Sequence, residues 1–146
     1  GGISGTVETF SLRSVKLRHY KGPLHTVPFG DLKAITNFSR DWVNEVLEVT
    51  VAFESDLERI ERAVERVSSE VMQDLSLASG IIAAPRSMGV TAMGVDGIHV
   101  GMIVRTRPGQ QFKVRAVMFS RLKSAFDADG IRFFGQTPIS AAGPPG

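Results

Sequence analysis

The sequence contains no cysteine. Without thiols the chain can form no disulfide scaffold, no cysteine-ligated zinc site and no cysteine nucleophile. An excess of charge is also missing: 17 Lys and Arg stand against 15 Asp and Glu, and the formal net charge is +2. So small a surplus does not indicate a polyanion as partner.

A long hydrophobic run is missing as well. A membrane-spanning helix needs about 18 or more consecutive apolar residues, and the longest candidate stretch, residues 80–85, is far shorter. The N-terminus shows no signal-peptide pattern. We therefore expect no membrane-spanning helix within this chain.

The side chains that carry chemistry are scattered. His19, His25 and His99 lack the spacing of a metal site, and no G-x-S-x-G elbow or Gly-rich phosphate loop occurs. Nothing in the sequence indicates two carboxylates with pKa values pushed apart, as general acid and base roles require. We therefore predict no enzyme, no cofactor and no metal.

The first part of the chain predicts a small β domain, residues 1–42. Apolar and polar residues alternate through most of residues 6–42. The alternation is interrupted at residues 21–22 and 29–31, where Gly occurs. This pattern is typical of short strands joined by tight turns.

The next segment predicts a strand followed by a helix. Residues 43–53 are rich in Val, and Ser55 with Glu58 fits a capping box at a helix start. Apolar residues then recur at helical spacing to about Leu75. The predicted stripe is Leu57, Ile60, Val64, Val67 and Val71. Residues 76–85 are expected to form a connection.

The last part predicts a hairpin, a helix and a short strand. The hairpin joins residues 88–95 to 98–105, with Asp96 and Gly97 as its turn. The helix ends near Ala128, with Gly130 as a left-handed cap, and residues 131–134 form the strand. The predicted helix stripe is Phe112, Ala116, Phe119, Leu122 and Phe126.

The order of these elements predicts a ferredoxin-like βαββαβ domain over residues 43–136. Two helices would cover one face of its antiparallel sheet. The remaining residues, 137–146, show no periodicity and are predicted to be a flexible tail. The fold class is therefore α+β, a small all-β domain followed by a ferredoxin-like domain.

Residues 6–42 also resemble the small β domain of the small-conductance mechanosensitive ion channel (MscS) family. The order and spacing of twelve positions carry this resemblance, although Phe29 stands where the family often has Asn. The twelve are Val7, Glu8, Leu12, Arg13, Leu17, Arg18, Gly22, Val27, Pro28, Asn37, Ser39 and Arg40.

The second half is similar to the same family. Residues 105–109 resemble its loop before the second helix, and residues 121–131 match its R-h-K-x-x-F-D-x-x-G-I segment. The resemblance thus covers about residues 5–131. It implies an Sm-like first domain, with Gly22, Pro28, Asn37, Arg40 and Gly130 in structural roles.

The resemblance further implies a function. The chain would be the cytoplasmic vestibule domain of a tension-gated channel that releases ions and small solutes on hypo-osmotic shock. It would assemble with itself, as a homoheptamer, into a ring that filters solutes. It would be attached to the inner (plasma) membrane of a bacterium through transmembrane helices absent from this chain.

Side openings of such a ring are expected near the junction of the two domains. Glu45 and Glu48 lie on the connecting strand, and we predict that at least one of them lines a passage, because a ring of carboxylates at a wet constriction favours cations. The alternative is that both are ordinary exposed residues of an alternating strand.

A different class of function remains open, a soluble module that binds RNA or protein through the same folds. The first part is basic, but RNA-binding sheets stack bases on aromatic side chains. Residues 88–105 contain no aromatic residue of the Phe, Tyr or Trp type, so no nucleic acid partner is expected. The basic residues are Arg13, Lys16, Arg18, Lys21, Lys33 and Arg40.

Overall fold

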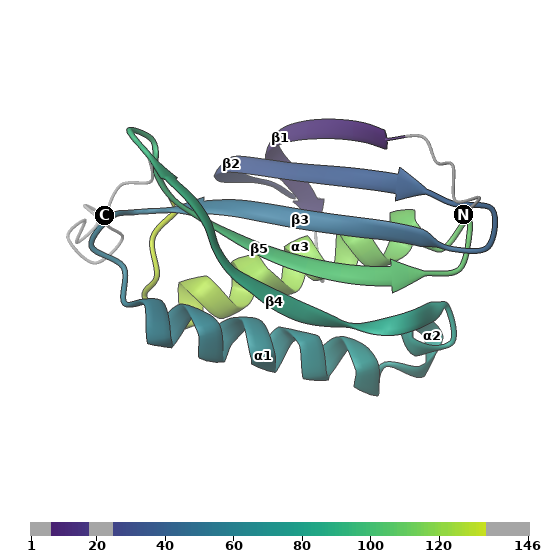
Figure 1. The fold of residues 1–146 in the computed structure, drawn as a ribbon. Coiled ribbons are helices and arrows are strands. Elements are labelled where there is room, and N and C mark those ends of the chain that lie inside the picture. The colour runs from purple at the N-terminus through teal and green to yellow at the C-terminus, as the bar shows by residue number, and fades with distance from the viewer. Residues whose placement is uncertain (1–6, 18–24, 134–146) are drawn as a thin grey trace.

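A computed structural model describes residues 7–17 and 25–133 of the chain. Two paired strands at the start are followed along the chain by a strand, two helices, two strands and a last helix (Figure 1). The elements are β1 (Val7–Leu17), β2 (His25–Phe38), β3 (Val43–Val51), α1 (Leu57–Gln73), α2 (Leu75–Ala78), β4 (Ile81–Gly94), β5 (Gly97–Thr106) and α3 (Gln111–Ala128).

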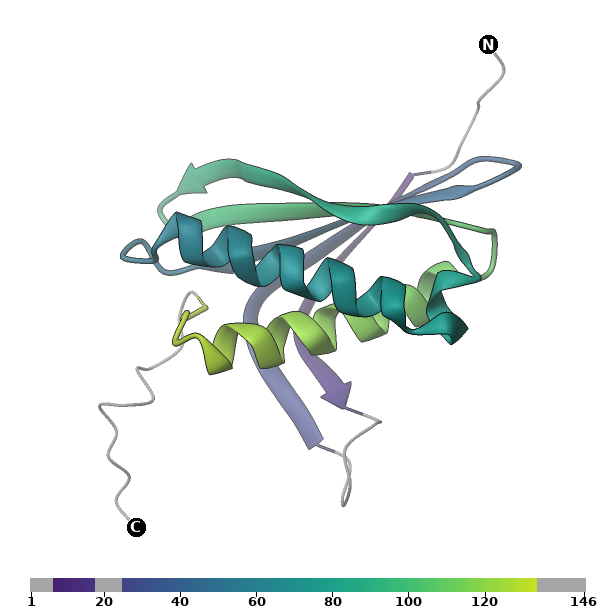
Figure 2. The same cartoon turned by 90° about the horizontal axis from the view of Figure 1, so that it is seen from below.

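The five strands form one antiparallel sheet in the order β1-β2-β3-β5-β4. Helices α1 and α3 lie side by side on one face of this sheet (Figures 1 and 2). The ends of β1 and β2 extend past α3 (Figure 2), and the register of this pair shifts between Leu12 and Ser14. One sheet and one layer of helices therefore carry all the side chains discussed below.

The core lies between the sheet and the two helices. Alternate residues of β3 face the helices and are buried, as the period of two requires. The predicted stripe of α1 is confirmed at Ile60, Val64, Val67 and Val71, which are all buried. Leu57, at the start of the helix, is exposed.

The predicted stripe of α3 is wrong at its beginning. Phe112 and Ala116 are not part of the buried side, which begins at Gln111 and Val114 instead. Further along, Phe119, Leu122 and Phe126 are buried as predicted. An aromatic at helical spacing near a helix end can face either way, because packing against the sheet selects the buried side.

Helix α1 begins one residue later than the capping box indicated. Its cap is Asp56, whose carboxylate accepts from the backbone N–H groups of Glu58 and Arg59 at 3.0 and 3.4 Å. Asp caps these free amides as well as Ser does. The segment predicted as a connection, 76–85, holds most of α2 and the first residues of β4.

The hairpin between β4 and β5 turns one residue earlier than predicted. Gly94 pairs with Gly97, so the turn residues are Val95 and Asp96. In the described ranges no residue other than glycine has a positive φ, which excludes a type I′ turn here. The positive φ, 124°, occurs at Gly97, the first residue of β5.

Beyond α3 the chain returns to the sheet. Gly130 has a φ of 71°, as predicted for a left-handed cap, and the N–H of Ile131 donates to the carbonyl of Phe126 at 2.8 Å. The predicted strand, 131–134, is reduced to one bridge between Phe133 and Val51. Of the predicted strand, residue 134 alone lies outside the described residues.

Candidate functional site

The two carboxylates predicted to line a passage lie on opposite faces of β3. Three positions separate them, and side chains alternate along a strand. Glu45 is on the face covered by the helices and is fully buried. The side chain of Glu48 is on the other face and is 19% exposed. The prediction that one of them lines a passage stays a prediction.

Glu45 belongs to a buried polar cluster that joins α3 to the sheet. Thr36 of β2 donates its hydroxyl to the Glu45 carboxylate. Arg115 of α3 donates from Nη1 to Glu45 Oε2 at 3.2 Å and to Thr36 Oγ1 at 3.3 Å. Burial raises the pKa of Glu45, and the bonds from Thr36 and Arg115 act against that rise.

A second cluster lies on the face away from the helices. His99 Nδ1 is 3.0 Å from Glu48 Oε1, and His99 Nε2 is 2.9 Å from Asp96 Oδ1. Thr91 of β4 donates its hydroxyl to Glu48 Oε2 at 2.8 Å. Side chains from β3, β4, β5 and the intervening turn therefore meet in one network, called here the His99 cluster (Glu48, Thr91, Asp96 and His99).

The charges of this cluster shift one another. The hydrogen bond to Asp96, and then the bond to Glu48, raise the pKa of His99 above its usual value. The bond from His99 lowers the pKa of Asp96. Both shifts favour the pair of a cationic imidazole and an anionic carboxylate.

A glycine makes room for this network. On β5, Gly101 lies opposite Glu48 of β3. A Cβ atom at Gly101 would lie 2.9 Å from Thr91 Cγ2 and 3.5 Å from Met88 Sδ. Because Gly101 has no side chain, Thr91 of β4 can lie close to the backbone of β5 and reach Glu48 on β3.

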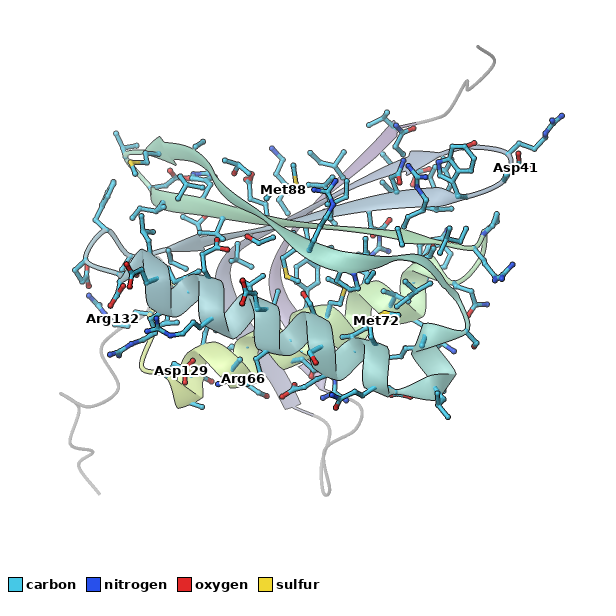
Figure 3. The ribbon with its side chains drawn as sticks, turned by 60° about the horizontal axis from the view of Figure 1, so that its bottom comes forward. Asp41, Arg66, Met72, Met88, Asp129 and Arg132 are labelled. Carbon is cyan, nitrogen blue, oxygen red and sulfur yellow. The ribbon has the colours of Figure 1, made fainter. Side chains whose placement is uncertain are left out.

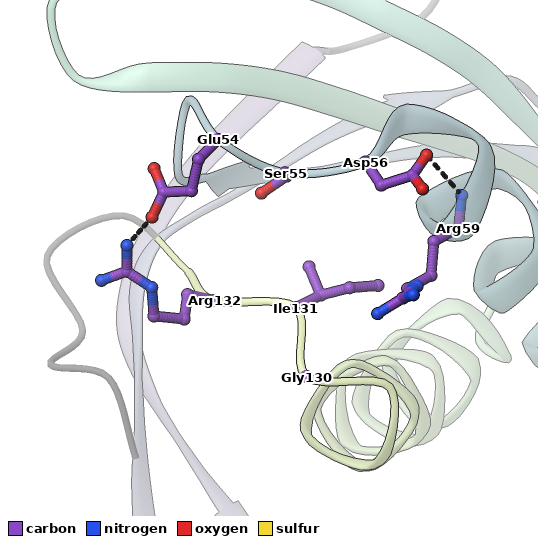
Figure 4. A pocket seen from close by; sticks show the side chains of 7 residues that line it. All are labelled: Glu54, Ser55, Asp56, Arg59, Gly130, Ile131 and Arg132. Atoms are coloured by element: carbon purple, nitrogen blue, oxygen red, sulfur yellow. Dashed lines mark hydrogen bonds and ion pairs between the residues drawn. The ribbon is translucent and has the colours of Figure 1, made fainter. Parts of the chain in front are cut away.

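A small hollow of about 190 Å³ lies where α1 begins. Its charged groups are already engaged: Arg132 pairs with Glu54, and Asp56 caps the helix (Figure 4). The hollow is lined by Glu54, Ser55, Asp56, Arg59, Gly130, Ile131 and Arg132.

Next to this hollow, α1 is tied to the end of α3. Arg66 Nη2 is 3.3 Å from Asp129 Oδ2, and Figure 3 shows the two side chains side by side. Arg59 Nη1 donates to the backbone carbonyl of Asp129 at 3.1 Å. Cations are favourable at the end of a helix, where free carbonyls gather. These arginines therefore have a structural role.

The residues of the family motif have the following places. Pro28 pairs with Ser14 between β2 and β1, and Asn37 lies between Val7 and Asn44 in the sheet. Arg40 is exposed in the turn before β3. Gly130 caps α3, and Gly22 lies outside the described residues. Their structural roles stay predictions.

Within the residues that the structure describes, no group of three or more His, Cys, Asp or Glu side chains could hold a metal ion. In the same residues no helix is both long and apolar enough to span a membrane. The Glu45 cluster and the His99 cluster contain groups that can carry charge and exchange protons, and their hydrogen bonds join different elements of the fold.

Sequence reasoning missed the partners of both carboxylates. Arg115 is 70 residues from Glu45, and His99 is 51 residues from Glu48. The spacing of Asp96 and His99 at the end of a predicted hairpin was the one local signal for the second cluster. Neither long-range pairing can be read from the sequence without knowing the strand order.

Comparisons with known proteins give a consistent result. A family model described as "Mechanosensitive ion channel MscS, C-terminal" matches residues 45–133. A second model, "Mechanosensitive ion channel, beta-domain", matches residues 1–40. The two matches follow each other along the chain and together cover most of it.

Individual relatives agree with these models. The chain is 30% identical over 132 residues to a small-conductance mechanosensitive channel of Caldanaerobacter subterraneus subsp. tengcongensis, covering 90% of this chain and 46% of the relative. It is 28% identical over 132 residues to the moderate conductance mechanosensitive channel YbiO of Escherichia coli, covering 90% of this chain and 18% of that relative. The chain thus spans less than half the length of these curated relatives.

A solved structure shares the fold. The crystal structure of Helicobacter pylori MscS in its closed state matches with a TM-score of 0.53 and 22% sequence identity. The match covers 90% of this chain and 51% of that one. At this identity the match describes the fold alone.

Proposed function

Because this chain belongs to the MscS family of mechanosensitive ion channels, we propose that it forms the cytoplasmic vestibule of a tension-gated channel. The channel releases ions and small solutes when hypo-osmotic shock stretches the inner membrane of a bacterium. The observation that carries this proposal is the succession of two family models along the chain, over residues 1–40 and 45–133. In this proposal the pore is formed by other parts of a longer polypeptide, since the match covers only 46% and 18% of the length of these two relatives.

We propose that the chain has an Sm-like part, residues 1–42, and a ferredoxin-like part, residues 43–136. The order β3-α1-β4-β5-α3 supports the second part, with α2 as a short insertion. The bridge of Phe133 to Val51 stands in the place of a last strand. The two parts share a sheet through the pairing of β2 with β3.

In the channel the chain assembles with itself into a ring, a heptamer in our proposal. The sheet supports this, since β1 is an edge strand of the described sheet. An edge strand presents backbone N–H and C=O groups that pair readily with another chain. A soluble module that binds RNA or another protein is not favoured by the comparisons, which find channels.

Of the two carboxylates on β3, we propose that Glu48 faces the solute passage. Glu48 is partly exposed on the face that no helix covers, whereas Glu45 is enclosed under α3. A carboxylate beside a water-filled passage attracts cations and repels anions. Glu45 then acts through packing and not through the passage.

The proposed function has a direct test. The channel polypeptide that carries this chain is expressed in a bacterium that lacks its own mechanosensitive channels, and membrane patches are stretched by suction. We expect currents that open with tension and cells that survive sudden dilution. A polypeptide that reaches the membrane as a ring but passes no tension-gated current would contradict the proposal.

The role of Glu48 is tested in the same patches. Glu48→Gln is expected to lower the ratio of cation to anion permeability, measured from reversal potentials in a salt gradient. Glu45→Gln should leave this ratio unchanged, because Glu45 is buried. The matched control is Glu58→Gln, which removes an exposed carboxylate on α1. If Glu48→Gln and Glu58→Gln give the same ratio as the unmodified channel, Glu48 is not part of the filter.

A further inference from the structure

His99 lies between two carboxylates that come from different parts of the sheet. Its two ring nitrogens are 3.0 Å from Glu48 Oε1 of β3 and 2.9 Å from Asp96 Oδ1 of the hairpin turn. Thr91 of β4 holds the second Glu48 oxygen at 2.8 Å. A single imidazole therefore connects the tip of the β4–β5 hairpin to β3.

This geometry selects one protonation state of the ring. An ionised carboxylate only accepts hydrogen bonds, so each ring nitrogen must donate a proton to make both bonds. The neutral imidazole has one N–H and can make only one of them. Loss of a proton places a nitrogen lone pair against a carboxylate oxygen and breaks one of the two connections.

The surroundings leave the ring within reach of solvent protons. The side chains of His99 and Glu48 are each 19% exposed, and the helices cover the opposite face of the sheet. On β3, Thr50 lies in register with His99, and on β4 the register partner is Ala92. Neither of these two carries a charge.

Among the side chains that the structure describes, three cations lie along the neighbouring strands of this face. Lys33 of β2 lies in register with Glu48. Arg86 of β4 lies in register with Ile103, further along β5 than His99. Arg105 donates from Nε to Asn44 at 2.9 Å. The hydrogen-bond partners of the ring are thus the two carboxylates, whereas these cations are in register with, or bonded to, other residues.

We propose that the His99 cluster is a proton-operated latch, in which the protonated imidazole fastens the hairpin tip to β3 and loss of one proton releases it. The latch itself follows from this chain and does not require the channel assignment. Its consequence for a channel rests on the proposed function. There the hairpin would loosen when the compartment beside the vestibule becomes alkaline, and Glu48 would lose its hydrogen-bonded cation.

The direction of the pH response follows from the shifts of the two groups. The pKa of His99 is raised in the folded chain, by Asp96 first and Glu48 second. Its stabilisation is therefore complete below the usual value near 6.5 and is lost as the pH rises through the raised value. The pKa of Asp96 is lowered, so its share is present above about 3.8 and is lost as the pH falls through the lowered value.

The latch is tested on the chain itself by nuclear magnetic resonance. The ring protons of His99 are titrated from about pH 5.5 to about pH 9, the range in which histidines change charge. In parallel, hydrogen-exchange protection factors are measured for the backbone amides of the hairpin tip, residues 93–99. We expect a His99 pKa above 6.5. The protection factors should fall as His99 loses its proton, by roughly tenfold, as for the loss of one hydrogen bond to a charged group.

Three variants separate the latch from ordinary stability. Asp96→Asn and Glu48→Gln should each move the His99 pKa back toward 6.5, and His99→Gln should make the protection of the tip independent of pH. His25→Gln is the matched control, because it removes a histidine at the start of β2 and should leave the tip response unchanged. If His99→Gln does not fold, the titrations of the unmodified chain and of Asp96→Asn still decide.

Either of two results would overturn the latch. One is a His99 pKa at or below 6.5 that Asp96→Asn does not change. The other is a protection of the hairpin tip that stays constant while His99 titrates. Neither measurement involves a membrane or a current, so the latch can fail while the channel proposal stands, and the reverse.

Discussion

Replacing Arg115 by Met is expected to lower the free energy of unfolding by about 3 kcal/mol, because it leaves a buried carboxylate without its cation. Glu45 is fully buried, and Arg115, whose side chain is 15% exposed, donates to it at 3.2 Å. Met replaces the apolar stem of Arg without the guanidinium, so much of the packing of that stem is kept. Urea denaturation of the chain at neutral pH measures the loss.

The same helix offers a matched control for this prediction. Arg121 of α3 also pairs with a glutamate, Glu70, at 3.3 Å, but these side chains are 38% and 41% exposed. A pair this exposed contributes about 1 kcal/mol or less. Equal losses for Arg115→Met and Arg121→Met would contradict the buried role of Arg115.

The charge of Glu45 can be separated from its packing. The double change Glu45→Gln with Arg115→Met removes both charges and should be more stable than Arg115→Met alone. Lowering the pH should also reduce the difference in the free energy of unfolding between Arg115→Met and the unmodified chain. Burial raises the pKa of Glu45, so the protonated, neutral form is favoured in the folded chain at low pH, and that stabilisation is lost as the pH rises through the raised value. If this difference in the free energy of unfolding does not vary with pH, the destabilisation of Arg115→Met does not come from an unpaired charge on Glu45.

Replacing Phe133 by Ala is expected to cost about 3–5 kcal/mol, the usual range for an aromatic removed from a core. The Phe133 side chain is fully buried, and its ring stacks on Phe126 with centroids 5.2 Å apart. The backbone of Phe133 also bridges to Val51 at the end of β3. The truncation therefore opens a cavity between α3 and the sheet. Thermal or urea unfolding of the chain measures the cost.

Phe112→Ala is the control for this second prediction. Phe112 is on α3 as well, but it is 58% exposed. Its truncation should change stability by about 1 kcal/mol or less, as for surface positions in general. A similar cost for Phe133→Ala and Phe112→Ala would mean that the segment after α3 does not complete the core.

Short patterns in the sequence determined much of the fold. The Val-rich segment predicted β3, the spacing of Ile60, Val64 and Val67 predicted the buried side of α1, and Gly130 predicted the end of α3. Each of these features depends on residues within one or two turns or on the period of two along a strand. Such information is local, so a single sequence contains it.

Local rules failed by small amounts where two residues could take the same role. Ser55 and Asp56 can both cap a helix, and the structure uses Asp56. The hairpin turn is at Val95 and Asp96 because Gly94 pairs with Gly97, and the strand register sets that pairing. Phe112 fits the helical spacing of α3 but lies outside the core. In each case the local pattern allowed more than one position, and the tertiary structure set the one that is used.

The candidate sites were decided by the tertiary structure alone. Three positions on a strand place Glu45 and Glu48 on opposite faces, and the alternative that both are ordinary exposed residues is wrong for Glu45, which is buried. The sequence could not determine which face the helices cover, nor that Arg115 and His99 meet these carboxylates across 70 and 51 residues. Those contacts depend on the sheet order and on where α3 packs. The physical reason is that backbone periodicity is set by neighbours, whereas a buried or bridged charge is set by whichever distant group folding places beside it.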